Sequence, residues 1–188
     1  MKRLFITGSI ILIFNTLFAQ EYNQSVNKNS DNSNVKFGQL ITVLPFGAKL
    51  YKNCFANAQD LFDNIKKTCW GKNLFVDFWA TWCSPCLEEW PNIKKLYLGE
   101  SNLQIEFIYI CTDYASDMKD WISTISRFKQ PGIHLFVENN IINDMFRLFP
   151  IAPSFPCYAF IDKNGKFRPE AFQRDTPPDF EKLKQLIK

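Results

Sequence analysis

The chain has 188 residues, of which 46% are hydrophobic and 16% aromatic. This length and composition predict one well-buried domain and leave little room for two. The net charge of +3 falls to +1 without Lys2 and Arg3. The remaining basic residues are scattered, so we expect neither nucleic acid nor an anionic surface as the partner.

The N-terminus has the pattern of a secretory signal peptide. Lys2 and Arg3 precede an apolar run over residues 4–18, and Ala19 follows it. The run has 15 residues, whereas a membrane-spanning helix needs about 20. We therefore expect a signal peptide over residues 1–19, cleaved after Ala19, with an uncleaved membrane anchor as the alternative. An exported, periplasmic chain works where disulfides persist, so each of the six cysteines is a possible bridge partner.

Residues 20–36 are rich in Asn, Ser, Gln and Lys, which predicts a flexible leader. The rest, residues 37–188, alternates between strand and helix patterns. We expect a hairpin over 37–51, helices over 56–68, 85–98, 118–128, 141–149 and from 180 onward, and strands over 74–79, 103–111, 132–137 and 158–162. The alternation predicts an α/β sandwich with parallel crossovers. A turn at 163–165 and a returning segment at 166–168 should add an antiparallel hairpin at the edge.

The stretch from Leu74 to Pro91 carries the chemistry. It begins as a buried strand and ends as a helix, with Cys83 and Cys86 at the junction. Because Pro85 suits the first turn of a helix, Cys83 faces unpaired backbone N–H groups and the positive end of the helix dipole, which stabilise a thiolate. Cys86 lies one turn deeper on the same side, within reach of a disulfide. The pair can cycle between dithiol and disulfide, with Cys83 attacking a substrate disulfide and Cys86 resolving the mixed disulfide.

A structural disulfide and half of a zinc site are the alternatives for this pair. A zinc site needs a second pair of Cys or His ligands, but the chain has a single histidine, His134, and no second C-x-x-C. A bridge across so short a loop would stabilise the fold very little. We therefore predict a redox pair that uses no metal and no cofactor.

The segment VDFWATWCSPC resembles the active-site strand and helix of the thioredoxin superfamily. The continuation C-x-x-E-x-P (Cys86, Glu89, Pro91) and the later PCYAFIDKNGK are most similar to its exported TlpA/ResA-type thiol–disulfide oxidoreductases. The resemblance covers Leu50 to the C-terminus. It implies a thioredoxin fold with a central mixed β-sheet and helices on both faces, here with an N-terminal hairpin extension.

The resemblance also implies a function and its partners. We expect a monomeric enzyme that reduces disulfide-bearing proteins, takes electrons from a membrane-bound or exported thiol protein, and belongs to cytochrome c biogenesis. A periplasmic dithiol oxidase or isomerase shares the site and differs in reduction potential. A non-catalytic binding module of the same fold is a further alternative, which the intact Cys83 and Cys86, with Asp77 nearby, argue against.

Two acidic residues match positions of the family. Asp77 matches the buried acid of thioredoxin, which is thought to help deprotonate the resolving cysteine, here Cys86. A carboxyl group in an apolar strand should have a raised pKa and exchange a proton near neutrality. The alternative is an acid at a strand edge, paired with a lysine. Glu89 matches a glutamate near the family's site. It either shares in this proton transfer or is simply an acid in the first turn of a helix.

The resemblance assigns the substrate face as well. Pro156 matches the cis-proline that faces the C-x-x-C, a geometry that leaves the backbone of Phe155 free to pair with an extended substrate. Pro150 and Pro153 are nearby rivals, and only the resemblance selects Pro156. Trp82, which precedes Cys83, is expected to contact the substrate.

The remaining cysteines include one departure from the family. Cys157 directly follows the expected cis-proline, where the family commonly has a small polar or apolar residue. It is either a buried small side chain or a third sulfur in a modified redox site. Cys54 and Cys69 should not pair, because an intact helix would hold them roughly 22 Å apart and a disulfide needs Cα atoms within about 7 Å. Cys111 is expected to be buried at a strand end.

Overall fold

The computed structural model describes residues 36–99, 104–149, 153–172, 178 and 180–187. The predicted signal peptide and all but the last residue of the predicted leader lie outside this range. The elements, in chain order, are β1 (Gln39–Val43), β2 (Ala48–Lys52), α2 (Ala58–Thr68), β3 (Asn73–Trp79), α3 (Ser84–Gly99), β4 (Ile105–Thr112), α4 (Met118–Phe128), β5 (Gly132–Val137), α5 (Asn139–Leu148), β6 (Cys157–Ile161), the short 3-10 helix η2 (Pro169–Ala171) and α6 (Phe180–Ile187). Among the helices described here, none is both long and apolar enough to cross a membrane.

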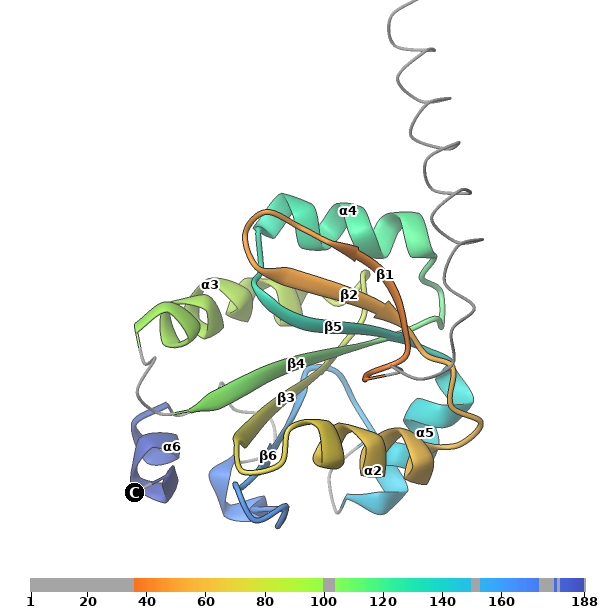
Figure 1. Ribbon diagram of the computed structural model, residues 1–188. Coiled ribbons are helices and arrows are strands. Elements are labelled where there is room, and N and C mark those ends of the chain that lie inside the picture. The colour runs from red at the N-terminus through yellow and green to blue at the C-terminus, as the bar shows by residue number, and fades with distance from the viewer. Residues whose placement is uncertain (1–35, 100–103, 150–152, 173–177, 179, 188) are drawn as a thin grey trace, which may run out of the picture. The chain divides into compact units, whose positions relative to one another are not determined.

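The strands form one mixed sheet in the order β1-β2-β5-β4-β3-β6, as Figure 1 shows. The four inner strands, β2, β5, β4 and β3, are parallel to one another. The edge strands β1 and β6 are antiparallel to β2 and β3. The predicted mixed sheet and N-terminal hairpin are therefore confirmed. Every residue of β3 is buried, as expected for a strand that is covered on both faces.

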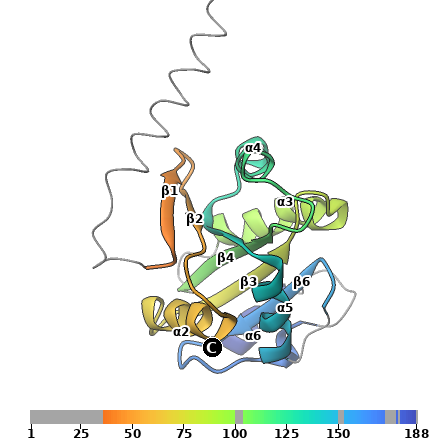
Figure 2. The same cartoon turned by 90° about the vertical axis from the view of Figure 1, so that its right-hand side faces the viewer.

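Helices cover both faces of this sheet (Figures 1 and 2). Helices α2 and α5 contribute Leu61, Ile65, Ile141 and Ile142 to a core on one face. Helices α3, α4 and α6 contribute Trp90, Ile93, Trp121 and Leu183 to a core on the other. Since side chains alternate along β3, Val76 and Phe78 enter the first core, whereas Phe75 and Trp79 enter the second.

The loop between β4 and α4 is fixed by a helix cap. The carboxylate of Asp117 accepts a hydrogen bond from the backbone N–H of Asp120 at 2.7 Å, which satisfies one of the unpaired donors at the start of α4. The helix ends at Lys129, which adopts the left-handed conformation. This cap holds the loop over residues 113–117 in place at the end of the sheet where β3 and β4 finish.

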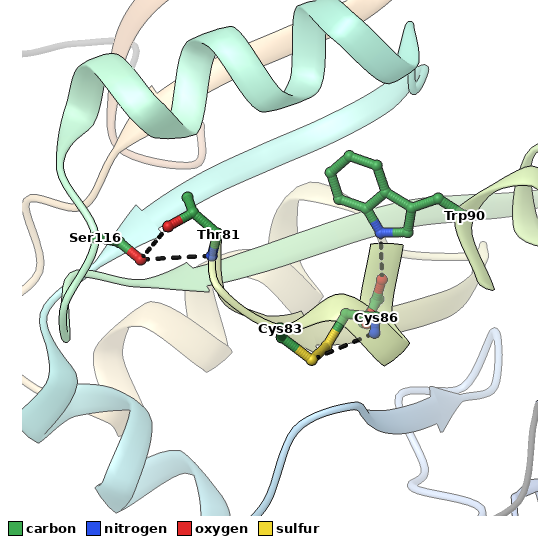
Figure 3. Close-up of a disulfide and its surroundings, with 6 residues drawn as sticks. Thr81, Cys83, Cys86, Trp90 and Ser116 are labelled. Carbon is green, nitrogen blue, oxygen red and sulfur yellow. Dashed lines mark hydrogen bonds between the residues drawn. A yellow bond between two sulfur atoms is a disulfide. The ribbon is translucent and has the colours of Figure 1, made fainter. Parts of the chain in front are cut away.

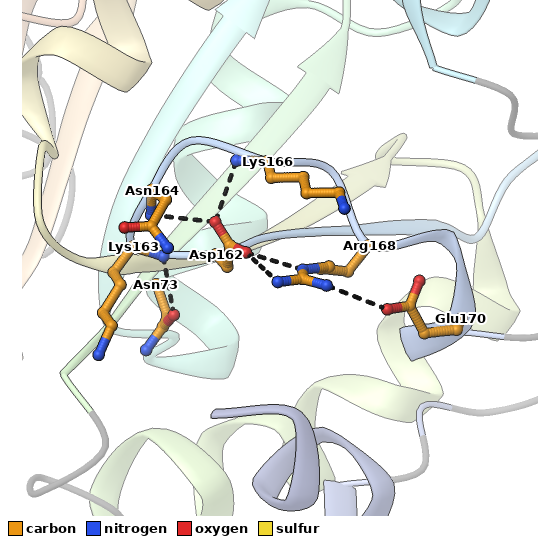
Figure 4. Close-up of polar contacts among 7 residues, drawn as sticks. All are labelled: Asn73, Asp162, Lys163, Asn164, Lys166, Arg168 and Glu170. Atoms are coloured by element: carbon orange, nitrogen blue, oxygen red, sulfur yellow. Dashed lines mark hydrogen bonds and ion pairs between the residues drawn. The ribbon is translucent and has the colours of Figure 1, made fainter. Parts of the chain in front are cut away.

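A short antiparallel return follows β6, as predicted. Ile161 and Phe167 form an antiparallel bridge, the Asp162 N–H donates to the Lys166 carbonyl and the Arg168 N–H donates to the Phe160 carbonyl, both at 2.9 Å. The carboxylate of Asp162 also holds the turn: it accepts the backbone N–H groups of Asn164 and Lys166, both at 3.0 Å, and two bonds from the Arg168 guanidinium (Figure 4).

Candidate active site

The end of β3 and the start of α3 bring the two predicted redox cysteines together. Cys83 directly precedes α3, and its carbonyl accepts the N–H of Leu87 at 3.2 Å. Cys86 lies in the first turn. Their sulfurs form a disulfide, with an S–S distance of 2.06 Å and Cα atoms 5.4 Å apart (Figure 3). The sequence prediction of a bridged pair at a helix N-terminus is confirmed.

The surroundings of the two sulfurs differ. The backbone N–H of Cys86 donates to Sγ of Cys83 at 3.3 Å. This N–H lies in the first turn of α3, where backbone N–H groups have no carbonyl partner within the helix. It therefore stabilises the negative charge that develops on Cys83 when the disulfide opens. Cys83 keeps 4% of its surface exposed and Cys86 none, so an incoming group meets Cys83 first. The difference supports Cys83 as the attacking and Cys86 as the resolving cysteine.

Asp77 lies in the middle of β3, on the sheet face that α3 covers, and is fully buried. Burial raises its pKa to about 8, although the indole N–H of Trp90, which donates to Oδ2 at 3.1 Å, acts in the opposite direction. The other oxygen, Oδ1, has no hydrogen-bond partner among the described residues. The alternative of a strand-edge acid paired with a lysine is therefore wrong. A carboxyl group with this pKa can take up or release a proton near neutrality.

Glu89 lies in the second turn of α3, so the alternative of an acid in the first turn is wrong. Its Oε2 accepts a hydrogen bond from Asn92 at 3.4 Å. Its charge also acts on Tyr158: burial most of all, and then the charges of Asp77 and Glu89, raise the pKa of the Tyr158 hydroxyl well above its usual range. Tyr158 is paired directly opposite Asp77 across β3 and β6. The two carboxyl groups thus share this tyrosine as a neighbour, which the sequence did not indicate.

The peptide bond between Phe155 and Pro156 is cis, as the family resemblance implied. The Phe155 ring lies 5.9 Å from the ring of Trp82, measured between centroids. Because Trp82 adjoins Cys83, the cis-proline loop and the disulfide border the same part of the surface. The structure therefore brings together the three residues predicted to contact substrate, from segments about 70 positions apart in the sequence.

The loop after β4 holds the disulfide loop in place. The hydroxyls of Thr81 and Ser116 are hydrogen-bonded at 2.8 Å, and the Thr81 N–H donates to the same Ser116 oxygen at 3.4 Å (Figure 3). The indole N–H of Trp82 donates to the backbone carbonyl of Tyr114 at 2.8 Å. Sequence analysis did not find Ser116 or Tyr114, because no motif connects this loop with the C-x-x-C.

The four other cysteines are free. Cys157 is buried in the core on the α2 and α5 face, whereas the Cys83–Cys86 disulfide belongs to the core on the opposite face. Burial raises the pKa of the Cys157 thiol to about 12. The structure favours a buried small side chain over a third redox sulfur. Cys111 is buried as predicted, and Cys54 and Cys69 do not pair.

His134 is buried in β5, and its Nε2 lies 3.0 Å from the backbone carbonyl of Gln130. Burial lowers its pKa to about 3, so the ring is neutral over the physiological range. In the part of the chain that the structure describes, no three His, Cys, Asp or Glu side chains come together as metal ligands.

Comparison with known proteins agrees with this geometry. ResA of Bacillus thuringiensis subsp. konkukian, named a thiol-disulfide oxidoreductase, is 28% identical over 117 residues, which cover 62% of this chain and 64% of the relative. ResA of Oceanobacillus iheyensis is 28% identical over 96 residues, covering 51% and 47%. The chain therefore spans less than two thirds of the length of these relatives.

Solved structures with the same fold include the thioredoxin domain of a thiol-disulfide oxidoreductase from Bacteroides vulgatus. Its TM-score is 0.54 at 22% identity, over 65% of this chain and 84% of that one. A secreted disulfide oxidoreductase from Mycobacterium tuberculosis has a TM-score of 0.50 at 19% identity, over 64% and 84%. A family model described as thioredoxin-like matches residues 71–167, which include both β3 with α3 and the cis-proline loop. This chain belongs to the thioredoxin-like family.

Proposed function

We propose that this chain is an exported thiol–disulfide oxidoreductase that reduces protein disulfides through Cys83 and Cys86. The observation that carries the proposal is the Cys83–Cys86 disulfide at the N-terminus of α3, beside a cis-proline loop. The buried Asp77 on the same face supports it, because its raised pKa suits proton exchange with a thiol. The ResA relatives, which are named for this activity, support it further.

The reaction begins with the dithiol form. The Cys83 thiolate attacks one sulfur of the substrate disulfide, forming a mixed disulfide and releasing a substrate thiolate that takes a proton from solvent. Asp77 in its ionised form takes up the proton of Cys86, and the Cys86 thiolate attacks Sγ of Cys83, which breaks the mixed disulfide. The second substrate sulfur leaves as a thiolate and takes that proton back from Asp77. The substrate gains two electrons and two protons, and Cys83 and Cys86 lose them. A membrane-bound or exported thiol protein returns the pair to the dithiol form.

Substitution of the two cysteines tests this sequence of steps. Cys83→Ser should abolish reduction of insulin disulfides, whereas Cys86→Ser should accumulate mixed disulfides that a reducing agent dissolves. Cys54→Ser is the matched control, because Cys54 is an exposed free thiol that is not part of the disulfide, and it should keep full activity. Turnover that survives in Cys83→Ser would refute the proposal. The partners trapped by Cys86→Ser would identify the physiological substrate.

The reduction potential of the Cys83–Cys86 pair tests whether the enzyme acts as a reductase or as an oxidase. A reductase needs a potential close to that of thioredoxin, about −270 mV, whereas a dithiol oxidase such as DsbA lies near −120 mV. We expect a value in the lower part of this range, from equilibration with glutathione or dithiothreitol buffers. A potential near the DsbA value would replace the reductase by the oxidase or isomerase alternative.

We extend the proposal to location and setting. Residues 1–19 are a signal peptide cleaved after Ala19, residues 20–36 a leader, and residues 37–188 the working domain, a monomer in the periplasm or its equivalent. The sequence pattern of the N-terminus supports this assignment, and the resemblance to exported TlpA/ResA-type oxidoreductases suggests cytochrome c biogenesis as the setting. Mass spectrometry of the extracytoplasmic protein should find Gln20 as its first residue, and deletion of the gene should lower c-type haem content. An intact N-terminus would contradict the proposed cleavage, and an unchanged haem content would contradict the setting in cytochrome c biogenesis.

A further inference from the structure

Three aromatic side chains lie together beside the disulfide. The centroid of the Trp82 ring is 6.3 Å from that of Tyr114 and 5.9 Å from that of Phe155, and the rings are nearly perpendicular in both cases. Trp82 is 49% exposed and Tyr114 60%, and exposed apolar side chains that lie side by side mark interaction sites. We call Trp82, Tyr114 and Phe155 the aromatic ledge.

Hydrogen bonds to the backbone and one further ring contact hold the ledge residues in place. The Trp82 indole donates to the Tyr114 carbonyl at 2.8 Å, and the Tyr114 N–H donates to Oγ1 of Thr112 at 3.1 Å. The Phe155 ring packs against Phe146 of α5 at 6.0 Å. Aromatic side chains that are already ordered lose little conformational entropy on binding, which makes them effective contact surfaces.

The segments that carry the ledge residues, together with the first turns of α3 that follow Trp82, contain charges of one sign. The segments 80–89, 113–117 and 153–156 contain four acidic residues and no Lys or Arg. These acids are Glu88, Glu89, Asp113 and Asp117, which we call the acidic rim. Asp113 and Asp117 accept backbone N–H groups, and none of the four forms an ion pair with a described cation. Their charge is therefore available to a partner.

We propose that the aromatic ledge and the acidic rim select protein disulfides whose cysteine adjoins an aromatic residue within a basic segment. The inference rests on the proposed function and names its substrate class. The aromatic side chain of the substrate packs on Trp82 and Tyr114 while its cysteine meets Cys83. The basic residues are attracted by the acidic rim, which raises the rate of encounter at low ionic strength.

Peptides with one cysteine, held as a mixed disulfide with thionitrobenzoate, test the proposal. The Cys83 thiolate attacks the peptide sulfur and releases yellow thionitrobenzoate, and Cys86 then displaces the peptide thiolate. The peptides combine Phe or Ala next to the cysteine with either Lys or Glu in the flanking positions. With the full chain in its dithiol form, we expect the Phe–Lys peptide to react about tenfold faster than the Ala–Lys and Phe–Glu peptides.

Two pairs of variants separate the ledge from the rim. Tyr114→Ala keeps both backbone hydrogen bonds of this residue and should reduce the preference for Phe over Ala to about twofold. Trp70→Ala is its control, because Trp70 is 74% exposed and precedes β3, at the opposite end of that strand, and should keep the preference. Asp113→Asn with Asp117→Asn should reduce the preference for Lys over Glu, as should 0.5 M salt with the unaltered chain. Glu181→Gln in α6 is the control for charge and should keep that preference.

The outcomes are distinguishable. If the unaltered chain releases thionitrobenzoate equally from all peptides, and Cys83→Ser releases none, the substrate preference is overturned and the proposed function stands. If no peptide and no small disulfide reacts in a Cys83-dependent way, the proposed function fails. A loss of the Phe preference in Trp70→Ala as large as in Tyr114→Ala would overturn the role of the ledge.

Discussion

Replacing Asp77 by Asn should stabilise the folded protein at neutral pH while slowing its redox cycle. Asn has the same shape as Asp and keeps an oxygen that can accept the Trp90 indole N–H, but it cannot ionise. Asp77 is fully buried, and burial raises its pKa from 3.8 to about 8. The folded protein at pH 7 must therefore hold a proton on Asp77 that the unfolded chain has already released, and this difference destabilises the fold.

The size of the effect follows from the two pKa values. A group whose pKa is raised by folding stabilises the folded state below its unfolded pKa, here 3.8, and the contribution disappears as the pH rises towards about 8. Each pH unit in this interval changes the free energy of unfolding by about 1.4 kcal/mol. From 3.8 to pH 7 the loss amounts to about 4 kcal/mol, a large part of the stability of a typical domain. Asp77→Asn should recover about that amount at pH 7 and almost nothing at pH 4.

Urea unfolding of the oxidised proteins at several pH values between 4 and 8 measures this difference. The gain of Asp77→Asn over the unaltered chain should grow steadily with pH. Asp120→Asn, an exposed carboxylate in α4, is the control and should change the free energy of unfolding by less than about 0.5 kcal/mol throughout. A gain that does not depend on pH, or a loss of stability at pH 7, would refute the reasoning.

His134 has the opposite effect on the pH dependence of stability, and it therefore affects how the free energy of unfolding of the unaltered chain varies with pH. Burial lowers its pKa from 6.5 to about 3, so its contribution to stability is complete above pH 6.5 and is lost as the pH falls towards 3. Between about pH 4 and 6.5 the effects of Asp77 and His134 nearly cancel. The unaltered chain should therefore have nearly constant stability in this range, whereas Asp77→Asn should gain stability as the pH rises.

Three further predictions concern positions outside the redox pair. Cys157→Ala should keep disulfide reductase activity within about twofold in the insulin assay, because this thiol is buried on the other face of the sheet. Gly132→Ala should lower the free energy of unfolding in urea by about 2–4 kcal/mol, since φ is +117° and a Cβ would lie 2.9 Å from the Tyr109 ring and 3.0 Å from the Phe107 carbonyl oxygen. Gly71→Ala is the control: its φ is +81° but the space around it is open, so it should lower the free energy of unfolding by only about 1 kcal/mol. Asp162→Asn should cost about 1–3 kcal/mol at pH 7, because Arg168 loses its closer charged partner and keeps only the more distant Glu170, at 3.7 Å. A difference from the unaltered chain that persists well below pH 3.8 would contradict this explanation.

Local patterns in the sequence predicted most of the fold, because the preference of each segment for strand or helix agrees with the element that it forms. The run over residues 74–79 is apolar throughout, which suits a strand covered on both faces, and Pro85 marks the start of α3. The position of the cysteine pair follows from these two signals alone. The turn and the short antiparallel return after β6 were predicted from the local sequence as well, but a turn sequence does not reveal that the Asp162 carboxylate holds the turn.

The rest of the site depends on contacts between distant segments. Nothing in the local sequence distinguishes Pro156 from Pro150 or Pro153, and family resemblance was needed to select it. The hydrogen bond from Trp90 to Asp77 and the contact of Tyr114 with Trp82 arise from packing of α3 and of the β4–α4 loop. Periodicity shows that a side chain faces the core, but it does not show which polar group the side chain meets there.

The pairing of β6 with β3 also insulates one thiol from another. Phe78 is paired with Cys157, and Asp77 with Tyr158, so successive side chains of β6 enter opposite cores. A slip of one residue in this pairing would turn the Cys157 thiol to the face of the Cys83–Cys86 disulfide and remove Tyr158 from it. The alternation of side chains along β6 thus separates a free thiol from a disulfide with which it could otherwise exchange. A change of register by a single residue would remove that separation, although the chain would keep all six cysteines.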